Sequence, residues 1–245
     1  MDHTISSLAT IVTPIWVSLT KPDDMIRFLL TDSRRLVEAK STLFFAITTS
    51  RNDGHHYVED LFKKGVRNFV VTNTQLFPNL LGHANFIQVE NTINALQKIA
   101  AAHRAEFQIP ILGITGSNGK TIVKEWLTQM ILTKLCVCAS PDSYNSQIGV
   151  PLSVWQLNDY HQLGLFEAGI SQPHEMESLQ KIIKPNYGIF TNIGQAHSEN
   201  FGTLEEKTIE KTKLFRETEV LIYCRDHELI HKVVKENLKS KTKLI

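Results

Sequence analysis

Residues 111–121 read Ile111-Leu112-Gly113-Ile114-Thr115-Gly116-Ser117-Asn118-Gly119-Lys120-Thr121, an apolar run that enters a glycine-rich turn and ends in a lysine and a threonine. Apolar residues then recur at helical spacing from Val123 to Met130. A strand, a glycine turn and a helix N-terminus hold phosphate groups, because the backbone N–H groups and the positive end of the helix face the anion. In such a site the lysine reaches the β and γ phosphates, and the threonine hydroxyl can ligate Mg²⁺. The stretch predicts a nucleotide-binding loop formed by Thr115, Gly116, Ser117, Asn118, Gly119, Lys120 and Thr121.

The spacing of this loop departs from the strict pattern G-x-x-x-x-G-K-[ST], because Ile114 occupies the position of the first glycine. A bare Gly-Lys-Thr triplet also occurs in ordinary strand–turn–helix connections, so that interpretation stays open on this stretch alone. The apolar strand before the turn and the helix after it favour a phosphate loop.

The chain after Pro110 alternates apolar runs with helix-compatible stretches. The predicted strands are 111–115, 134–139, 162–167, 187–192 and 219–223, and a last helix over 228–238 leads into the start of a sixth strand at 242–245. This alternation builds a parallel sheet that is covered by helices on both faces. We predict an α/β fold in which residues 108–245 form an incomplete P-loop central domain with a doubly wound, mostly parallel sheet.

The first hundred residues form a smaller α/β unit in the same way. Strands are expected at 27–30, 43–47, 69–71 and 86–89, and helices at 55–64 and 92–107. Pro110 then breaks the helical pattern just before a new strand. The sequence therefore predicts a first domain over residues 1–107.

Charge and composition narrow the class of protein. The formal net charge is +1, with 11 basic and 10 acidic residues before Pro110 and 15 of each after it, so neither part carries a field suited to nucleic acid. No apolar run approaches the roughly 20 residues of a membrane span, and residues 1–16 lack the pattern of a signal peptide. The cysteines Cys136, Cys138 and Cys224 form no C-x-x-C pair and predict buried thiols. We expect a cytoplasmic protein that does not bind nucleic acid and does not insert into a membrane.

Two further side chains follow predicted strands of the second domain. Glu167 ends one apolar run and His197 follows the next. Ligand groups gather at the carboxyl edge of a doubly wound sheet, so both can reach one crevice. A carboxylate suits Mg²⁺, whereas histidine is an uncommon ligand for that ion. A solvated loop acid and a structural histidine are the alternatives.

Several segments resemble one family when they are taken in order. The loop 115–121 is similar to the T-G-[ST]-[NS]-G-K-T motif of the Mur ligases, the ATP-dependent amide-bond-forming enzymes of peptidoglycan precursor synthesis. Residues 143–152, which include Asn145, resemble the N-x-x-I-G-V-P-L segment of its MurF branch, and Phe166-Glu167-Ala168-Gly169 resembles its E-x-G segment. Residues 191–197 resemble N-I-x-x-A-H. The resemblance covers essentially the whole chain and favours MurF over MurE.

This resemblance implies a reaction. The γ-phosphate of ATP passes to the C-terminal carboxylate of UDP-MurNAc-tripeptide, and the amine of D-Ala-D-Ala attacks the acyl phosphate. The implied catalytic residues are Lys120, Asn145, Glu167, His197 and Lys211, and the implied Mg²⁺ ligands are Thr121, Glu167 and His197. Lys211 lies fourteen residues after His197, where the family carries a carbamylated lysine, but Glu210-Lys211-Thr212-Lys213 departs from the usual A-K-G-E. Lys207 and Lys213 are competing candidates.

Two segments of the first domain resemble those that hold the uridine-diphosphate sugar in MurE and MurF. Thr31-Asp32-Ser33-Arg34 is similar to T-D-S-R, and Arg51-Asn52-Asp53-Gly54-His55 resembles R-x-D-G-H. Hydroxyl groups and a guanidinium suit a uracil edge and a diphosphate. The predicted UDP-substrate residues are Thr31, Asp32, Ser33, Arg34, Arg51, Asp53, Gly54 and His55, with a turn and a surface arginine as the alternative.

Three alternatives stay open beside a MurF-like activity: a MurE-like ligase, a folylpolyglutamate-type ligase, and a non-catalytic module that binds a UDP-sugar or nucleotide. Family members carry a further C-terminal domain. We therefore expect these residues to be the N-terminal part of a longer ligase, of a kind that includes fusions to alanine racemase. We expect them to bind ligands without turnover when alone.

Overall fold

The glycine-rich loop of residues 115–121 follows the carboxyl end of a central strand in a six-stranded sheet. This sheet belongs to the second of two compact units. The computed structural model describes residues 3–194, 200–238 and 240–245. The chain divides between Ile99 and Ala100, inside helix α3 (Thr92–Ala105). The functional division predicted between residues 107 and 108 stays a prediction. Each unit is described by itself.

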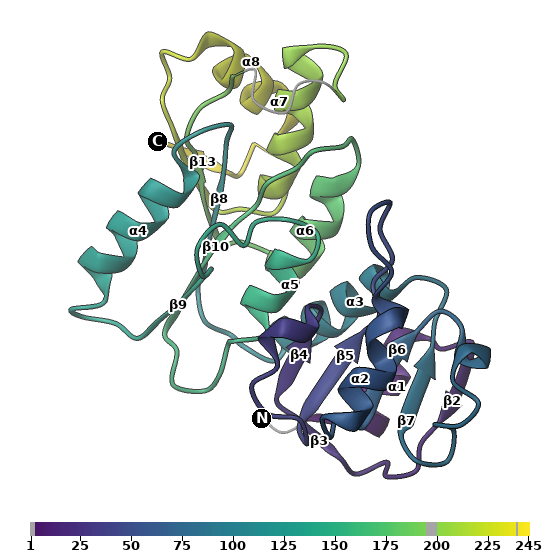
Figure 1. The fold of residues 1–245 in the computed structure, drawn as a ribbon. Coiled ribbons are helices and arrows are strands. Elements are labelled where there is room, and N and C mark those ends of the chain that lie inside the picture. Colours follow the sequence, from purple (N-terminus) through teal and green to yellow (C-terminus); the bar gives the residue numbers. More distant parts are fainter. Residues whose placement is uncertain (1–2, 195–199, 239) are drawn as a thin grey trace. The chain divides into compact units, whose positions relative to one another are not determined.

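All five neighbouring strand pairs described in the second unit are parallel. The strand order is β13-β12-β11-β8-β10-β9. The strands are β8 (Ile111–Thr115), β9 (Val137–Ala139), β10 (Leu163–Glu167), β11 (Tyr187–Phe190), β12 (Val220–Tyr223) and β13 (Lys243–Leu244). Helices cover both faces, which confirms the predicted doubly wound fold: α4 (Lys120–Ile131) lies on one side, and α5 (Gly149–Val154) and α6 (Glu175–Ile183) lie on the other (Figure 1).

The first strand of this unit, β8, lies in the middle of the sheet, between β10 and β11. The chain builds one half of the sheet through β9 and β10 and then crosses β8 to build the other half. In open α/β sheets ligands bind at such a switch point, outside the carboxyl ends of the strands. The residues that follow β8, β10 and β11 therefore share one edge.

The remaining helices of the second unit are α7 (Leu204–Thr212), the 3-10 turn η4 (Lys213–Phe215) and α8 (Glu228–Asn237). A capping box begins α7, in which Thr203 and Glu206 satisfy each other's backbone N–H groups. Apolar side chains from α5, α6, η4 and α8 pack with those of the strands in one core that contains Phe166, Phe190, Leu214 and Phe215. This core fixes the edge on which the loop sits.

The first unit has a five-stranded sheet in the order β2-β7-β6-β5-β4. Its strands are β2 (Trp16–Ser18), β4 (Phe28–Leu30), β5 (Thr42–Phe45), β6 (Asn68–Val71) and β7 (Asn85–Gln88), and only β2 runs antiparallel to its neighbour. Stacked rings of Phe69, Phe77 and Phe86 form part of the core. The other elements are β1 (His3–Thr4), β3 (Met25–Ile26), α1 (Ile5–Val12), α2 (Val58–Lys63), η1 (Ser33–Arg35), η2 (Gly54–Tyr57) and η3 (Thr74–Leu76).

The structure bears on two further expectations, which concern membrane-spanning helices and the burial of the cysteines. Among the described residues, no helix combines the length and the apolar character that crossing a membrane requires. The prediction of three buried thiols is wrong for two of them, because only Cys138 is buried while Cys136 and Cys224 are exposed. Cys136 precedes strand β9 and Cys224 follows strand β12, so both lie just outside the sheet.

Candidate functional site

The loop between β8 and α4 has the backbone that its glycines predict. Gly116 has φ +147° and Gly119 has φ +79°, in the region that favours glycine. A Cβ atom on Gly116 would lie 2.0 Å from the hydroxyl oxygen of Thr191, so no side chain fits there. Helix α4 begins at Lys120 directly after Gly119. The loop therefore leads directly into the positive end of a twelve-residue helix.

The segment after β11 holds this loop in place. The N–H groups of Ser117 and Asn118 donate to the backbone oxygen (2.9 Å) and the side-chain oxygen (3.0 Å) of Asn192. The N–H of Gly194 donates to the Ser117 hydroxyl over 2.9 Å, and the Thr191 hydroxyl donates to the carbonyl of Asn118 over 2.6 Å. The motif of residues 191–194 thus fixes the phosphate loop through the backbone.

One residue predicted to bind ATP is used differently. Thr115 is fully buried, and its hydroxyl donates to the carbonyl oxygen of Ala168 over 2.7 Å. This bond joins the end of β8 to the residue after β10. The side chain of Thr115 is therefore committed to holding the two strand ends together. Of residues 116–121, Asn118 is exposed, Gly116 is buried and the others are half-buried.

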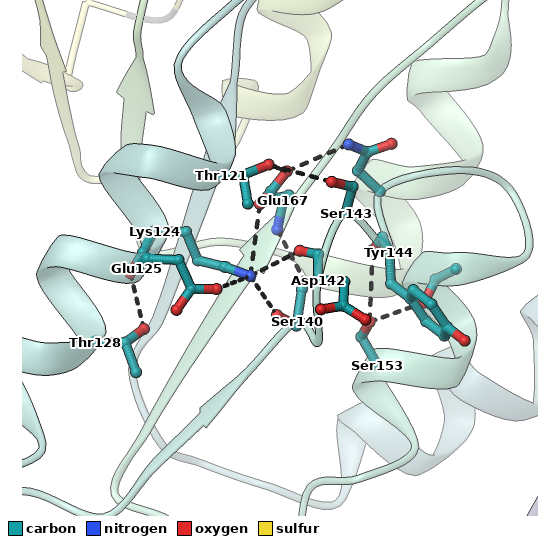
Figure 2. A network of polar contacts seen from close by, with 12 residues as sticks. Thr121, Lys124, Glu125, Thr128, Ser140, Asp142, Ser143, Tyr144, Ser153 and Glu167 are labelled. Carbon is teal, nitrogen blue, oxygen red and sulfur yellow. Dashed lines mark hydrogen bonds and ion pairs between the residues drawn. The ribbon is translucent and has the colours of Figure 1, made fainter.

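The carboxylate of Glu167 accepts hydrogen bonds from two of the predicted site residues. The Thr121 hydroxyl and the Asn145 side-chain amide each donate to Oε2 of Glu167 over 3.2 Å, although 46 and 22 residues separate them from it in the sequence. Gly169 allows this, because a Cβ there would lie 2.8 Å from the amide oxygen of Asn145. Figure 2 shows Thr121 and Ser143 beside Glu167, with their hydroxyl oxygens 3.5 Å apart. The structure therefore brings Thr121, Asn145 and Glu167 together.

Two lysines contact the loop, and a third contacts the segment after β11 that holds it. Lys120 donates to the carbonyls of Gly116 (3.0 Å) and Ser117 (3.3 Å), and Lys211 donates to the same Gly116 carbonyl over 3.1 Å. Lys207 donates to the carbonyl of Gly194 over 2.6 Å. Burial lowers the pKa of all three lysines. This concentration of positive charge favours an anion at the loop.

The pKa of Lys211 is lowered to about 7, chiefly by burial and then by the charges of Lys120 and Lys207. Glu167 acts in the opposite sense on Lys120 and partly offsets the effect of burial on its pKa. Lys213, the competing candidate two residues on, is ion-paired with Glu210 (2.7 Å) and Glu177 (3.3 Å) instead. Its hydrogen bonds and charges raise its pKa.

The donor set beside the loop fits Mg²⁺. A threonine hydroxyl and a glutamate carboxylate are hard oxygen ligands, and Mg²⁺ prefers such ligands together with phosphate and water. Glu167 is fully buried, and its Oε1 has no hydrogen-bond partner among the described residues. The third predicted ligand, His197, lies outside the described residues. The set of three Mg²⁺ ligands therefore stays a prediction. Two of its residues, Thr121 and Glu167, lie close enough to bind one ion.

The predicted UDP-substrate segments follow two adjacent strands of the first unit. Residues 31–34 follow β4 and residues 51–55 follow β5, and these strands pair in parallel, so both segments lie beyond the same edge. Asp32 accepts two hydrogen bonds from the Arg34 guanidinium, at 2.9 and 2.7 Å. Arg34 lowers the pKa of Asp32 to about 2. The Arg34 side chain is 86% exposed and can still meet a ligand.

His55 and Gly54 are placed differently from the rest of the predicted UDP-substrate set. His55 is buried, with Nδ1 2.6 Å from Asp53 and Nε2 accepting from the N–H of Thr72 over 3.1 Å. Hydrogen bonds from His55 lower the pKa of Asp53 to about 2. A Cβ on Gly54 would lie 2.6 Å from the backbone nitrogen of Ile47. Both residues shape the segment from within, whereas Arg51 is exposed.

The sequence interpretation gave no role of their own to four residues that hold this site together: Lys124, Ser140, Ser143 and Asn192. Ser143 and Asn192 nevertheless lie in the segments 143–152 and 191–197 that it singled out. Lys124 had a detectable signal, because it lies between Val123 and Leu127 on the stripe of α4 that faces the sheet. A charged residue inside such a stripe is seldom buried without partners. Ser140 gave no signal, since small polar residues after strands are common.

Comparison with known proteins places this architecture. The family model of the Mur ligase middle domain matches residues 114–245, more than half of the chain. The chain belongs to the Mur ligase family. The resemblance inferred from the ordered motifs is confirmed.

Two curated relatives of this Mur ligase chain carry the same name. It is 30% identical over 233 residues to the UDP-N-acetylmuramoyl-tripeptide–D-alanyl-D-alanine ligase of Bacillus subtilis (strain 168), covering 94% of this chain and 50% of that protein. It is 35% identical over 193 residues to the ligase of the same name in Treponema pallidum (strain Nichols), covering 75% and 41%. The chain thus spans about half the length of the curated relatives that it matches.

Solved structures of two MurF enzymes share the fold of this Mur ligase chain. MurF from Acinetobacter baumannii aligns with a TM-score of 0.83 at 24% identity, over 97% of this chain and 52% of that one. MurF from Thermotoga maritima, solved in complex with ADP, aligns with a TM-score of 0.76 at 24% identity, over 89% and 49%. At this identity the likeness concerns the fold.

Proposed function

We propose that this chain forms the UDP-precursor-binding and ATP-binding parts of a ligase that adds D-Ala-D-Ala to UDP-MurNAc-tripeptide with hydrolysis of ATP. The names of its relatives support this assignment. The observation that carries it is the meeting of Thr121 and Asn145 on Glu167, beside the phosphate loop that begins α4. A nucleotide-binding module without catalysis would need the loop but not this carboxylate and amide.

The residues of the site divide the work of phosphoryl transfer. Lys120 places a positive charge where the β and γ phosphates of ATP would lie, and Thr121 and Glu167 would hold Mg²⁺. The ion, when bound, neutralises charge on the phosphates, which is the main requirement of this chemistry. Asn145 is placed to orient the substrate's carboxylate or a water molecule. Attack of that carboxylate on the γ phosphorus forms an acyl phosphate and releases ADP, and attack of the D-Ala-D-Ala amine then releases phosphate.

We extend the proposal to a carbamate on Lys211. A neutral lysine amine adds to CO2 and releases a proton, which converts a cation into an anionic group. The lowered pKa of Lys211, about 7, keeps much of the amine neutral near physiological pH. Lys213 is a poorer candidate because its ion pairs hold it in the charged form. The residues in which this segment departs from A-K-G-E support the choice. Glu210 pairs with Lys213, so its carboxylate is engaged by the competing lysine.

The first unit supplies the site proposed for the UDP-sugar. Arg34 and Ser33 lie beyond the carboxyl end of β4, and Arg51 lies beyond the neighbouring strand β5. A guanidinium suits a diphosphate because it can donate two parallel hydrogen bonds. We place the reaction in the cytoplasm, where nucleotide-linked precursors and ATP occur together.

The decisive experiment measures phosphate release by the full-length polypeptide with ATP, Mg²⁺ and UDP-MurNAc-tripeptide, with and without D-Ala-D-Ala. Release that requires both substrates, together with formation of the pentapeptide precursor, is expected. Release that requires a single amino acid would instead favour a MurE-like ligase. Activity with folate and glutamate that ignores UDP-sugars would favour the folylpolyglutamate type. Tight binding of the UDP-precursor without any Mg²⁺-dependent binding of ATP would identify a non-catalytic module.

A further inference from the structure

A second lysine of α4 lies buried behind the proposed metal site. Lys124 is 1% exposed, and its ammonium group is at the centre of the network in Figure 2. It donates to the backbone carbonyls of Ser140 and Asp142, each over 2.7 Å, and pairs with the carboxylate of Glu125 over 2.7 Å. Oε1 of Glu167 lies 3.7 Å away. An ammonium group has three donors, and the three partners at 2.7 Å, which are Ser140, Asp142 and Glu125, account for them.

The carbonyls that accept from Lys124 belong to the loop that carries Asn145. The N–H of Glu167 donates to the Ser140 hydroxyl over 3.2 Å, and the N–H of Ser140 donates to the carbonyl of Leu165 over 3.0 Å. Asp142 has φ +45°, an unusual backbone that aspartate tolerates better than most residues. Lys124 thus joins three elements: helix α4, the loop over residues 140–145, and strand β10.

The two oxygens of Glu167 are used separately. Oε2 accepts from Thr121 and Asn145, whereas Oε1 has no hydrogen-bond partner among the described residues and faces the ammonium group of Lys124. A fully buried carboxylate is costly unless an opposite charge is near it. The ammonium group behind Oε1 and the two donors at Oε2 together fix the orientation of the carboxylate.

We propose that Lys124 is a positioning residue, an internal ammonium group that holds Glu167 and the loop over residues 140–145 in the arrangement in which Thr121 and Asn145 meet Oε2. It acts through Glu167 and touches neither nucleotide nor substrate. The proposal rests on the proposed function for the identity of the ligand, a metal–nucleotide complex. Its structural part concerns the chain alone and can be tested without any ligand.

Two physical roles for Lys124 give opposite results when its charge is removed. If the ammonium group only repels a cation, then Lys124→Met should strengthen metal binding at Glu167. If it positions the carboxylate, the same change should weaken metal binding. Removing a partner that orients a metal ligand typically lowers metal affinity by roughly 10- to 100-fold.

The experiment measures Mn²⁺ binding by electron paramagnetic resonance, in the full-length polypeptide with a non-hydrolysable ATP analogue. We expect Lys124→Met to raise the dissociation constant of Mn²⁺ at least about tenfold. In a double-mutant cycle, Lys124→Met should add less than about twofold to the effect of Glu167→Gln, because Lys124 acts through that carboxylate. Lys232→Met is the matched control, since it removes a lysine paired with Glu205 on the surface.

A second measurement needs no ligand. In Lys124→Met, hydrogen exchange should accelerate at least about fivefold at the amides of Glu167 and Gly169, which donate to Ser140 and to the carbonyl of Asn145. Exchange at the amides of β12, which lies in the same unit, should stay within about twofold, which shows that the second unit is still folded. Unchanged exchange at the amides of Glu167 and Gly169, tighter or unchanged Mn²⁺ binding, or additive effects in the cycle would each overturn the proposal. If the parent protein binds no Mn²⁺–nucleotide, the proposed function fails, and the exchange measurement still decides the role of Lys124.

Discussion

Lys211 and Gly116 are joined by a hydrogen bond of 3.1 Å between the ammonium group of one and the carbonyl oxygen of the other, although 95 residues separate them. Lys120 donates to the same carbonyl over 3.0 Å. Burial is the main cost of charging Lys211, and two ammonium groups on one oxygen also repel each other. This explains why the pKa of Lys211 falls to about 7 while that of Lys120, which has Glu167 near it, is less affected.

The first prediction concerns the carbamate on Lys211. With ¹³C-labelled bicarbonate, the carbonyl region of the carbon NMR spectrum should contain a carbamate signal that disappears in Lys211→Ala. Stripping CO2 from the buffer should lower the rate of ligation, and adding bicarbonate should restore it. The rate should also fall below pH 7, because protonation of the amine blocks addition of CO2. Lys213→Ala is the matched control and should keep the signal.

The second prediction follows from the same pKa. In CO2-free buffer, between pH 7 and the ordinary value of 10.5, the unfolded chain binds a proton that the folded chain has lost at Lys211, so stability rises with pH. Lys211→Met removes this dependence. The free energy of unfolding of the parent should rise relative to that of the variant by up to about 1.4 kcal/mol per pH unit.

Urea unfolding followed by tryptophan fluorescence measures this difference. In a Trp16→Phe background the signal comes from Trp126 and Trp155, which both lie in the second unit. Below pH 7 the difference should become constant, because both states of the parent then carry the proton. Lys232→Met should run parallel to the parent from pH 7 to 9, since its ion pair raises its pKa. If the free energies of unfolding of the parent and of Lys211→Met change in parallel over this pH range, the pKa of Lys211 is not lowered in the folded protein.

The third prediction separates the two binding sites. Lys120→Ala should lower ligation by the full-length polypeptide at least about 100-fold, because the charge beside the transferred phosphate is lost. Affinity for the UDP-precursor should stay within about twofold, since Lys120 lies in the second unit. Phosphate release measures the first effect and calorimetry the second. Turnover at the parent's rate would contradict the assignment of this loop.

Much of this architecture could be predicted because the strands are short apolar runs bounded by glycine, proline or polar turns. The strands β8, β10 and β12 lie within a residue of their predicted limits. The convergence of Thr121 and Glu167 was predictable too, because strand order in such folds brings carboxyl ends to one edge. These inferences need only local patterns and the topology that they imply.

The rest depends on contacts that no local pattern encodes. Helix α1 (Ile5–Val12) has apolar residues at helical spacing, yet an eight-residue stretch is too short to be distinguished by periodicity alone. Strand β2 pairs antiparallel with β7. The direction of this pairing depends on tertiary packing and is not encoded in the local sequence. Arg51 and His55 belong to one motif, but one is exposed and the other is buried. Only the folded chain separates a residue that meets a ligand from one that shapes its loop.

The fourth prediction tests the first unit. Arg34→Lys should weaken binding of the UDP-precursor by about tenfold, because an ammonium group cannot pair with Asp32 through two bonds and still present donors in a fixed plane to a diphosphate. Binding of Mg²⁺–ATP should not change. Arg35→Lys is the matched control, with an expected effect below about twofold. Equal losses in the two variants would point to general positive charge instead of a built site.

The fifth prediction concerns the missing side chain of Gly169. In Gly169→Ala the new Cβ would lie 2.8 Å from the amide oxygen of Asn145, so the amide must move and its bond to Glu167 is lost. We expect Mn²⁺ with the ATP analogue to bind about tenfold more weakly, as in Asn145→Ala. The double variant should be no weaker than Asn145→Ala, because both changes remove the same bond. If their effects instead add, Gly169 acts through the backbone of β10, and the space it leaves for Asn145 is not the reason a glycine is needed there.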